Sequence, residues 1–282
     1  MKKVALINDL SGFGKCSLTA AIPVISAIGI QACPLPTAVL SAQTGFPDYY
    51  CDDYTDRMDC FIREWKNMKV SFDGISSGFL ASPEQISKVA YFLEEFKTKD
   101  TMYFLDPVMG DNGHTAKNFS KELLEGMKNL AKSADIITPN LTELCLLTGK
   151  SFEDLVSHKE KEDYTERIRE VCLDIIRKSD LNPRVVVTGI IRMINEQEYM
   201  GNLIVSKNET FFIEKPYIRQ SFSGTGDLFA AFVCGLTIKG MEVKDSVQKA
   251  VDFLYDAIFE AADQKLDSRH GVPFEKYLSH LL

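Results

Sequence analysis

A segment of small residues near the end of the chain carries the most clearly defined chemistry. Residues 221–227, SFSGTGD, precede the apolar run LFAAF, which we expect to form a helix. Unpaired N–H groups and the positive end of the macrodipole make the start of a helix attract anions. Gly224 and Gly226 allow the backbone to approach a phosphate with no Cβ in the way. The segment therefore predicts an anion-binding loop that places Asp227 in the first turn of a helix.

Asp227 has two interpretations on local sequence alone. As a general base it would take the proton from a hydroxyl that attacks phosphorus, which typically contributes about 10²–10⁴-fold in rate. As an ordinary acid near a helix start it would stabilise the helix by only about 0.3–1 kcal/mol. The local pattern supports both interpretations equally.

The elements that position this loop follow from short apolar runs that alternate with segments of helical spacing. Strands are predicted at 4–7, 30–39, 74–79, 102–105, 136–137 and 185–187, with a hairpin of 199–205 and 210–213 around a turn at 207–209. Helices are predicted at 18–28, 55–68, 83–96, 121–131 and 162–177, and two more close the chain. Segments 111–119 and 190–200 are expected to be loops.

This alternation predicts an α/β fold of three layers, αβα, with a mostly parallel central sheet. No repeat or low-complexity linker divides residues 1–282, so a single domain is expected. Ligands of such sheets bind beyond the carboxyl ends of the strands. The polar residues at those positions are Asn8, Asp9, Asp106, Thr138, Asn140, Thr188 and Gly189, together with the 221–227 loop.

Composition limits the class of partner. Lys and Arg number 32 against 40 Asp and Glu, a net charge of −8, which argues against nucleic acid or an anionic membrane as the partner. The seven cysteines are scattered with no C-x-x-C pair, as expected of reduced thiols in a cytoplasmic protein. The apolar N-terminal run is broken by Asn8 and Asp9, and no stretch approaches the ~20 apolar residues of a membrane helix. A soluble, cytoplasmic protein is expected.

Four ordered segments carry a resemblance to a known family. Residues 224–227, GTGD, followed by LFAA, resemble the signature of ribokinase-like kinases, and of pyridoxal kinases in particular. Residues 106–111 (DPVMGD), 135–144 (DIITPNLTEL) and 185–189 (VVVTG) resemble further segments of these kinases in the same order. The resemblance spans most of the chain. It implies a ribokinase-like fold and transfer of the ATP γ-phosphate to the 5′-hydroxyl of pyridoxal, pyridoxine or pyridoxamine.

The resemblance also implies roles for individual residues. Asp227 would be the catalytic base, and the backbone of Gly224, Thr225 and Gly226 would form the anion hole for the γ-phosphate. ATP and Mg²⁺ would be the cofactors, with a monovalent cation left open, and the family implies a homodimer. The residues implied in nucleotide binding are Asp106, Asn140, Glu143, Thr188, Gly189 and Thr225, with Asp106 and Glu143 as the magnesium ligands, directly or through water.

Substrate recognition is expected in the first third of the chain. Residues 41–46, SAQTGF, match a pyridoxal kinase segment that ends in Thr-Gly-aromatic, where Thr44 would hydrogen-bond the pyridine ring. Phe79 stands where that family places an aromatic residue. The substrate-binding set implied for this chain is Asp9, Ser11, Gln43, Thr44 and Phe79, together with Asp227.

Two positions depart from the pyridoxal kinase pattern and keep an alternative open. Asp9 stands where many of those kinases have Ser, and Gln43 where they have His. Gln43 is similar to the Gln with which hydroxymethylpyrimidine kinases bind the pyrimidine, so an enzyme of thiamine biosynthesis is the rival hypothesis. A sugar kinase is less favoured, because no β-hairpin lid is expected near the start of this short chain.

A non-catalytic vitamin-binding or regulatory protein is the alternative from a different class. The complete 224–227 loop, with Asn140 and Glu143, argues against it, because a binding module has no physical need for an acid at the γ-phosphate position.

Overall fold

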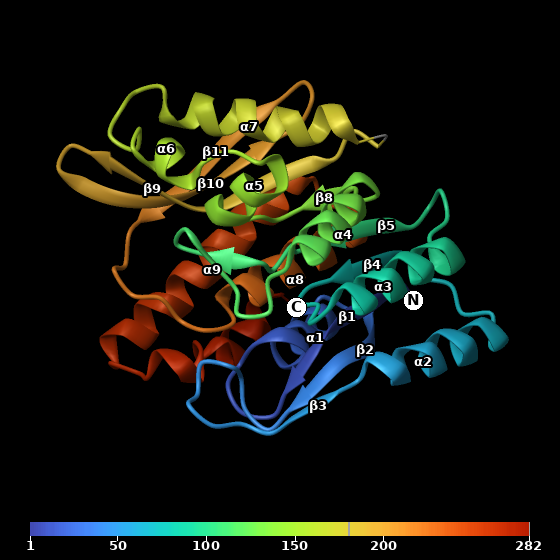
Figure 1. Ribbon diagram of the computed structural model, residues 1–282. Coiled ribbons are helices and arrows are strands. Elements are labelled where there is room, and N and C mark those ends of the chain that lie inside the picture. Colours follow the sequence, from blue (N-terminus) through green and yellow to red (C-terminus); the bar gives the residue numbers. More distant parts are fainter. Residues whose placement is uncertain (180, 282) are drawn as a thin grey trace. The chain divides into compact units, whose positions relative to one another are not determined.

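The computed structural model describes residues 1–179 and 181–281 and divides into two compact units (Figure 1). The first unit comprises residues 1–102 and 218–282, and the second comprises residues 103–217. Each unit has its own strands and covering helices. Among the described residues, no helix is long and apolar enough to cross a membrane.

The described residues of the first unit form four strands in the order β4-β1-β2-β3. Their bounds are β1 Lys3–Ser11, β2 Gln31–Leu40, β3 Cys51–Asp53 and β4 Gly74–Ser77. β1 is parallel to both β2 and β4, whereas β3 is antiparallel to β2. Residues 4–7 of β1 are at most 3% exposed, because helices cover both faces of a parallel sheet.

The helices of the first unit come from both ends of the chain. Their bounds are α1 Ser17–Ala27, α2 Thr55–Asn67, α3 Pro83–Phe96, α8 Thr225–Lys239 and α9 Val243–Asp263, followed by the 3₁₀ turns η1 Ser268–His270 and η2 Phe274–Leu281. α1 packs on α8, and α8 packs on α9, while α2 packs on α3. Helices from the end of the chain thereby pack on its first helix.

The second unit begins within β5 and combines parallel with antiparallel pairing. β5 (Met102–Leu105), β8 (Ile136–Ile137) and β9 (Arg184–Ile194) are parallel neighbours. β10 (Gln197–Val205) and β11 (Thr210–Pro216) continue the sheet in antiparallel fashion. A separate two-residue ladder joins β6 (Gly110–Asp111) and β7 (His114–Thr115).

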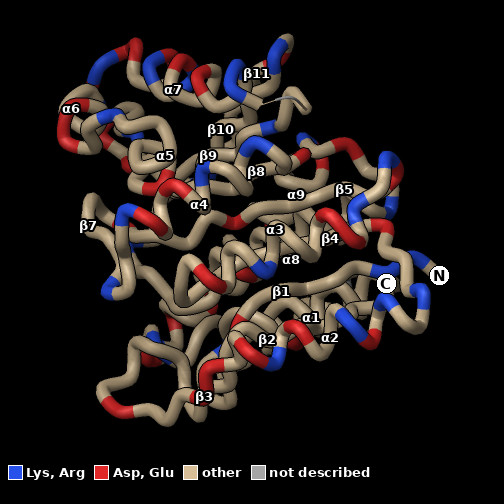
Figure 2. Tube along the Cα trace, turned by 45° about the vertical axis from the view of Figure 1, so that its right-hand side comes forward, with Lys and Arg blue, Asp and Glu red and all other residues tan. Residues whose placement is uncertain are grey.

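The helices that accompany these strands are α4 Lys121–Lys132, α5 Leu141–Thr148, α6 Phe152–Val156 and α7 Tyr164–Lys178. α7 carries alternating acidic and basic residues along its length (Figure 2). Ion pairs at helical spacing join Arg167 to Asp163 and Arg169 to Glu166. Its opposite face, which includes Ile168 and Cys172, is buried. α7 is therefore an amphipathic covering helix rather than a basic surface.

The structure confirms the predicted strand–helix alternation and the hairpin, whose register runs from Tyr199–Pro216 to Val205–Thr210. The expected loop at 190–200 is wrong, since its ends lie in β9 and β10 and only residues 195–196 form the turn. β9 extends because Arg192 pairs with Glu214 at 2.9 Å and stacks over Phe212, which stabilises a partly polar stretch. β3, β6, β7 and α6 were not expected, and none exceeds five residues.

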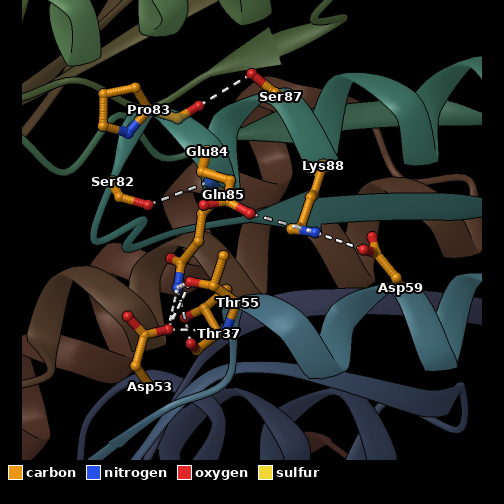
Figure 3. Close-up of polar contacts among 10 residues, drawn as sticks. All are labelled: Thr37, Asp53, Thr55, Asp59, Ser82, Pro83, Glu84, Gln85, Ser87 and Lys88. Atoms are coloured by element: carbon orange, nitrogen blue, oxygen red, sulfur yellow. Dashed lines mark hydrogen bonds and ion pairs between the residues drawn. The ribbon is translucent and has the colours of Figure 1, made fainter.

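A buried glutamine joins four segments of the first unit (Figure 3). Gln85 is fully buried in the first turn of α3, where its Oε1 accepts the Ala81 N–H at 2.8 Å. Its Nε2 donates to the Thr37 carbonyl and to Thr55 Oγ1, both at 2.9 Å. Thr37 Oγ1 in turn donates to the Phe79 carbonyl at 3.2 Å. Gln85 thereby fixes the 79–81 loop relative to β2 and α2.

Replacing Gln85 with Ala should lower the free energy of unfolding by about 2–3 kcal/mol, because buried N–H and C=O groups would lose their partners. Chemical denaturation measures this change. Gln248→Ala on the exposed face of α9 is the matched control, with an expected change within about 0.5 kcal/mol. Equal effects of the two substitutions would contradict this role of Gln85.

Candidate active site

Asp227 lies in the first turn of α8, as its sequence context indicated. Gly224 is the N-cap residue in a left-handed conformation, φ +80°. A Cβ there would lie 1.8 Å from the Lys15 carbonyl oxygen, so only glycine allows this close approach. A Cβ at Gly226, in contrast, would meet no atom within 4 Å. The two glycines thus differ: Gly224 is required for packing, whereas Gly226 borders open space beside Asp227.

Thr225 is the first residue of α8, and its hydroxyl donates to the Phe222 carbonyl at 3.0 Å. The loop before it is held by the C-terminal segment, because the Ser223 N–H donates to the Ser268 carbonyl at 2.9 Å. Lys15 adds a second link, with its Nζ 2.7 Å from Glu275 Oε2 and 3.2 Å from the Val272 carbonyl. The C-terminal segment therefore bonds both to the glycine loop and to Lys15, whose carbonyl oxygen faces Gly224.

Two polar groups hydrogen-bond the Asp227 carboxylate. Asn8 Nδ2 donates to Asp227 Oδ1 at 3.1 Å, and the Ser17 backbone N–H also donates to this carboxylate. Ser17 adopts φ +51°, a left-handed conformation that costs a non-glycine residue roughly 1–2 kcal/mol. This conformation brings the start of α1 to the start of α8.

A second carboxylate, that of Asp9, lies buried in the same region. Its oxygens accept Ser17 Oγ at 2.6 Å and Ser11 Oγ at 3.0 Å. Burial raises the pKa of Asp9, and the two serine hydrogen bonds oppose that rise. The predicted substrate residues Asp9 and Ser11 are therefore together, and both bond within the protein.

Burial raises the pKa of Asp227 from 3.8 to about 6, and the negative charge of Asp9 adds to the rise. The hydrogen bonds from Ser17 and Asn8 favour the ionised form and partly offset it. The neighbouring Cys16 thiol has its pKa raised to about 12 by burial and by the charge of Asp227. Near neutral pH, Asp227 is mostly ionised and holds a proton more readily than an exposed carboxylate, which suits a general base.

Gln43 is buried, and its amide is used within the first unit. Nε2 donates to Ser223 Oγ at 3.2 Å and to the Arg269 carbonyl at 3.1 Å, while Oε1 accepts the Gly45 N–H at 2.6 Å. The structure thus places Gln43 as a link between three segments. Thr44 is exposed on the adjacent turn.

An aromatic cluster lies beside this link. The rings of Phe13 and Phe46 are 5.4 Å apart, and His270 stacks on Phe46 at 5.9 Å. The Arg269 guanidinium lies over Phe46 at 5.1 Å. Phe79, the other predicted aromatic, is half-buried after β4, with its N–H donating to Asn8 Oδ1 at 2.9 Å.

Except for Thr225, which begins α8 in the first unit, the predicted nucleotide residues lie in the second unit. Asn140 is the N-cap of α5 and forms a capping box with Glu143: Asn140 Oδ1 accepts the Glu143 N–H at 3.0 Å, and Glu143 Oε2 accepts the Asn140 N–H at 2.9 Å. Glu143 Oε1 also accepts the Met109 N–H at 3.1 Å. Glu143 is thereby fixed against the segment that follows Asp106.

Burial, followed by the charges of Asp106 and Asp111, raises the pKa of Glu143 well above its ordinary value. A bound cation would relieve the repulsion between Glu143 and these neighbouring carboxylates. Within the described ranges, no group of three or more His, Cys, Asp or Glu side chains could hold a metal ion. Asp106 and Glu143 still fit Mg²⁺, which commonly binds one or two carboxylates and keeps several waters.

Thr188 and Gly189 form a β-bulge in β9. The register with β10 passes from Val187–Leu203 to Ile190–Gly201, so two residues lie opposite Asn202. Gly189 has φ +72°, and a Cβ on it would meet nothing within 4 Å. A single parallel bridge joins Thr188 to Asn140, with the Thr188 N–H donating to the Pro139 carbonyl at 2.9 Å. The bulge brings Thr188 beside Asn140.

Sequence reasoning missed three residues of these sites as site residues. The sequence marks Asn8 and Thr138 only as polar residues after strands, and it does not mark Ser17. Thr138 Oγ1 is the one buried side-chain polar atom of the described residues found without a hydrogen-bond partner. Position after a strand was the signal for two of them, but no sequence signal marks the left-handed conformation of Ser17.

The arrangement of strands and helices, with an acid at the start of α8, defines the class of ribokinase-like small-molecule kinases. Pyridoxal kinase structures share the fold: that from Lactobacillus plantarum is 24% identical with a TM-score of 0.87, covering 100% of this chain and 97% of the other. The predicted fold class is confirmed.

Within this class, residues 16–272 match the family model described as phosphomethylpyrimidine kinase, and the chain belongs to that family. A Bacteroides thetaiotaomicron protein provisionally described as a phosphomethylpyrimidine kinase is 35% identical, with a TM-score of 0.91 over 99% of this chain and 93% of the other. A second crystal form of that protein contains pyridoxal. A pyridoxal kinase from Paraburkholderia xenovorans is 25% identical over 94% of this chain and 91% of its own length. The prediction of a phosphotransferase related to pyridoxal kinases is confirmed.

The two glycines should respond differently to alanine. Gly224→Ala should lower the free energy of unfolding by about 3 kcal/mol or more, because of the Lys15 clash and the left-handed φ. Gly226→Ala should leave it unchanged or raise it by up to about 1 kcal/mol, as in other helices. Urea unfolding of both variants measures this. Similar destabilisation of both would contradict the open space at Gly226.

Asp227→Asn should stabilise the protein in a pH-dependent way. The folded pKa of Asp227, about 6, lies above the ordinary 3.8. The wild-type protein therefore loses stability as pH rises through this interval, because the carboxylate must ionise in a buried position. The variant should gain about 2–4 °C in Tm at about pH 8 and nothing at about pH 4. Asp100→Asn, at an exposed position, is the control. A gain that does not depend on pH would contradict the raised pKa.

Proposed function

We propose that the protein is an ATP- and Mg²⁺-dependent kinase that phosphorylates the 5′-hydroxyl of a B6 vitamer: pyridoxal, pyridoxamine or pyridoxine. The observation that carries the proposal is Asp227, a carboxylate of raised pKa beside the open face of Gly226 at the start of α8. A pyridoxal kinase from Leishmania donovani, bound to ADP and pyridoxamine, has this fold with 20% identity and a TM-score of 0.85.

In the transfer step, the acceptor oxygen attacks the γ-phosphorus, and the bond from that phosphorus to the bridging oxygen of ADP breaks. The acceptor proton passes to Asp227. The backbone N–H groups of Gly224, Thr225 and Gly226 stabilise charge on the transferring phosphoryl group, since they are unpaired donors at a helix start. Phosphoryl transfer depends mainly on such positioning and charge stabilisation.

A second part of the proposal concerns the nucleotide and its cation. Asn140, Thr188 and Gly189 would contact the nucleotide phosphates, with Thr138 as a further donor. Asp106 and Glu143 would hold Mg²⁺ directly or through water, and the cation would neutralise phosphate charge.

On the acceptor side, the proposed ring-binding residues are Thr44 and Phe79, with Asp9, Ser11 and Gln43 supporting them. The internal hydrogen bonds of Asp9 and Gln43 favour a role in fixing the shape of this region. A homodimer, a single domain, a cytoplasmic location and the use of a monovalent cation stay predictions.

Phosphorylation of hydroxymethylpyrimidine is the second candidate, favoured by the family description and by Gln43. Against it, both amide hydrogens of Gln43 are donated within the protein. In its favour stands the 35% identity to the Bacteroides protein, but that same protein also binds pyridoxal in one crystal form.

The test measures ADP release from ATP·Mg²⁺ with pyridoxal, pyridoxamine, pyridoxine and hydroxymethylpyrimidine in parallel. We expect turnover of a B6 vitamer above the rate without acceptor. Asp227→Asn should lower kcat by about 10²–10⁴-fold while pyridoxal still binds. The wild-type kcat/KM should fall as pH drops below about 6, since the base is then protonated.

Other outcomes are equally informative. Turnover of hydroxymethylpyrimidine alone would establish the second candidate. Binding of pyridoxal without any turnover would support the vitamin-binding protein. Asp227→Asn with undiminished turnover would remove Asp227 from the role of base.

A further inference from the structure

The side-chain amide of Asn8 has one orientation that satisfies its neighbours. Its Oδ1 accepts two backbone N–H groups, from Asp9 at 3.0 Å and from Phe79 at 2.9 Å. Both partners are donors, so the oxygen must face them and the nitrogen must face Asp227. The 3.1 Å contact is therefore a hydrogen bond that Asn8 donates and Asp227 accepts.

Gly78 preserves the space for this amide. A Cβ on Gly78 would lie 2.4 Å from Asn8 Nδ2 and 2.8 Å from its Cγ. The Gly78 N–H donates to the Ile7 carbonyl at 2.9 Å, which holds the backbone in place. The φ of Gly78 is not left-handed, so the requirement for glycine here comes from the Asn8 amide.

The charged and titratable surroundings of Asp227 are unfavourable to its ionised form. Asp9 from β1 adds a negative charge, and the Cys16 thiol at the start of α1 adds a group that would be negative if ionised. Asn8 and the Ser17 backbone are the neutral donors that offset them. Unlike the Ser17 backbone, Asn8 can be removed by substitution.

We infer that Asn8 is a positioning residue for phosphoryl transfer: it fixes the rotation of the Asp227 carboxylate and keeps that carboxylate ionised, and Gly78 is glycine to make this possible. The inference rests on the proposed role of Asp227. Asn8 acts through Asp227 and need not touch the acceptor or the nucleotide.

The experiment compares pH profiles of kcat/KM for Asn8→Ala, Gly78→Ala and Thr37→Val. A hydrogen bond to a charged group corresponds to a pKa shift of about one unit or more, so the acid limb of the first two variants should move upward by about one pH unit. Their kcat/KM near that limb should fall about tenfold or more. Thr37→Val is the control, because it removes the Thr37 bond to the Phe79 carbonyl and leaves Asn8 intact. Its acid limb should stay at the wild-type position.

Two results would overturn the inference while leaving the proposed function standing. One is an unmoved acid limb in a folded Asn8→Ala variant. The other is an equal displacement in Thr37→Val, which would assign the effect to the Phe79 loop.

A measurement of stability tests Asn8 without any turnover. The Tm gain from Asp227→Asn at about pH 8 should be larger in the Asn8→Ala background than in the wild type, because the ionised carboxylate has then lost a donor. An equal gain in both backgrounds would contradict the inference. If no acceptor is phosphorylated, the proposed function fails, yet this comparison still reports whether Asn8 stabilises ionised Asp227.

Discussion

The close approach of Gly224 to the Lys15 carbonyl oxygen is the constraint on which the geometry of the first unit depends. Any Cβ at residue 224 would lie 1.8 Å from that oxygen, so the starts of α1 and α8 can meet only at a glycine. Because they meet there, Asp227 comes within hydrogen-bonding distance of both Asn8 and the Ser17 backbone. Gly271 also approaches Lys15 closely, since a Cβ on residue 271 would lie 2.9 Å from Lys15 Cβ. One steric condition thus determines where the proposed base lies.

The meeting of α1 and α8 also brings together features that each cost folding free energy. Two carboxylates, Asp9 and Asp227, share a largely buried environment, and each has a raised pKa. Ser17 adds backbone strain through its left-handed conformation. Strain and buried charge persist where the surrounding structure over-determines them, and they cluster at functional sites. Here the surrounding structure is the fully buried stretch of β1 and the fixed C-terminal segment, which hold the site in a conformation that it would not adopt alone.

Much of this arrangement could be predicted from the sequence, because local rules govern it. Strand–helix alternation gave the fold class, and the position after a strand marked Asp106, Asn140 and Thr188. The capping box of Asn140 and Glu143 follows from their three-residue spacing. The role of Gln43 could not be predicted, because its partner Arg269 lies 226 residues away. The orientation of the Asn8 amide could not be predicted either, since it depends on the Phe79 N–H, 71 residues along the chain. β3 was missed because three residues show no periodicity.

Gln43 has a consequence for attempts to redesign this protein. Its amide hydrogen-bonds the Gly45 N–H, Ser223 Oγ and the Arg269 carbonyl, so it links segments from distant parts of the chain. A neutral histidine there has one ring N–H to donate and one ring nitrogen to accept, so it could replace at most one of the two bonds that Gln43 donates. Replacing Gln43 alone would therefore leave Ser223 or the Arg269 carbonyl without its bond to residue 43. Engineering of acceptor choice would have to exchange residue 43, residue 223 and the 267–271 turn as one module.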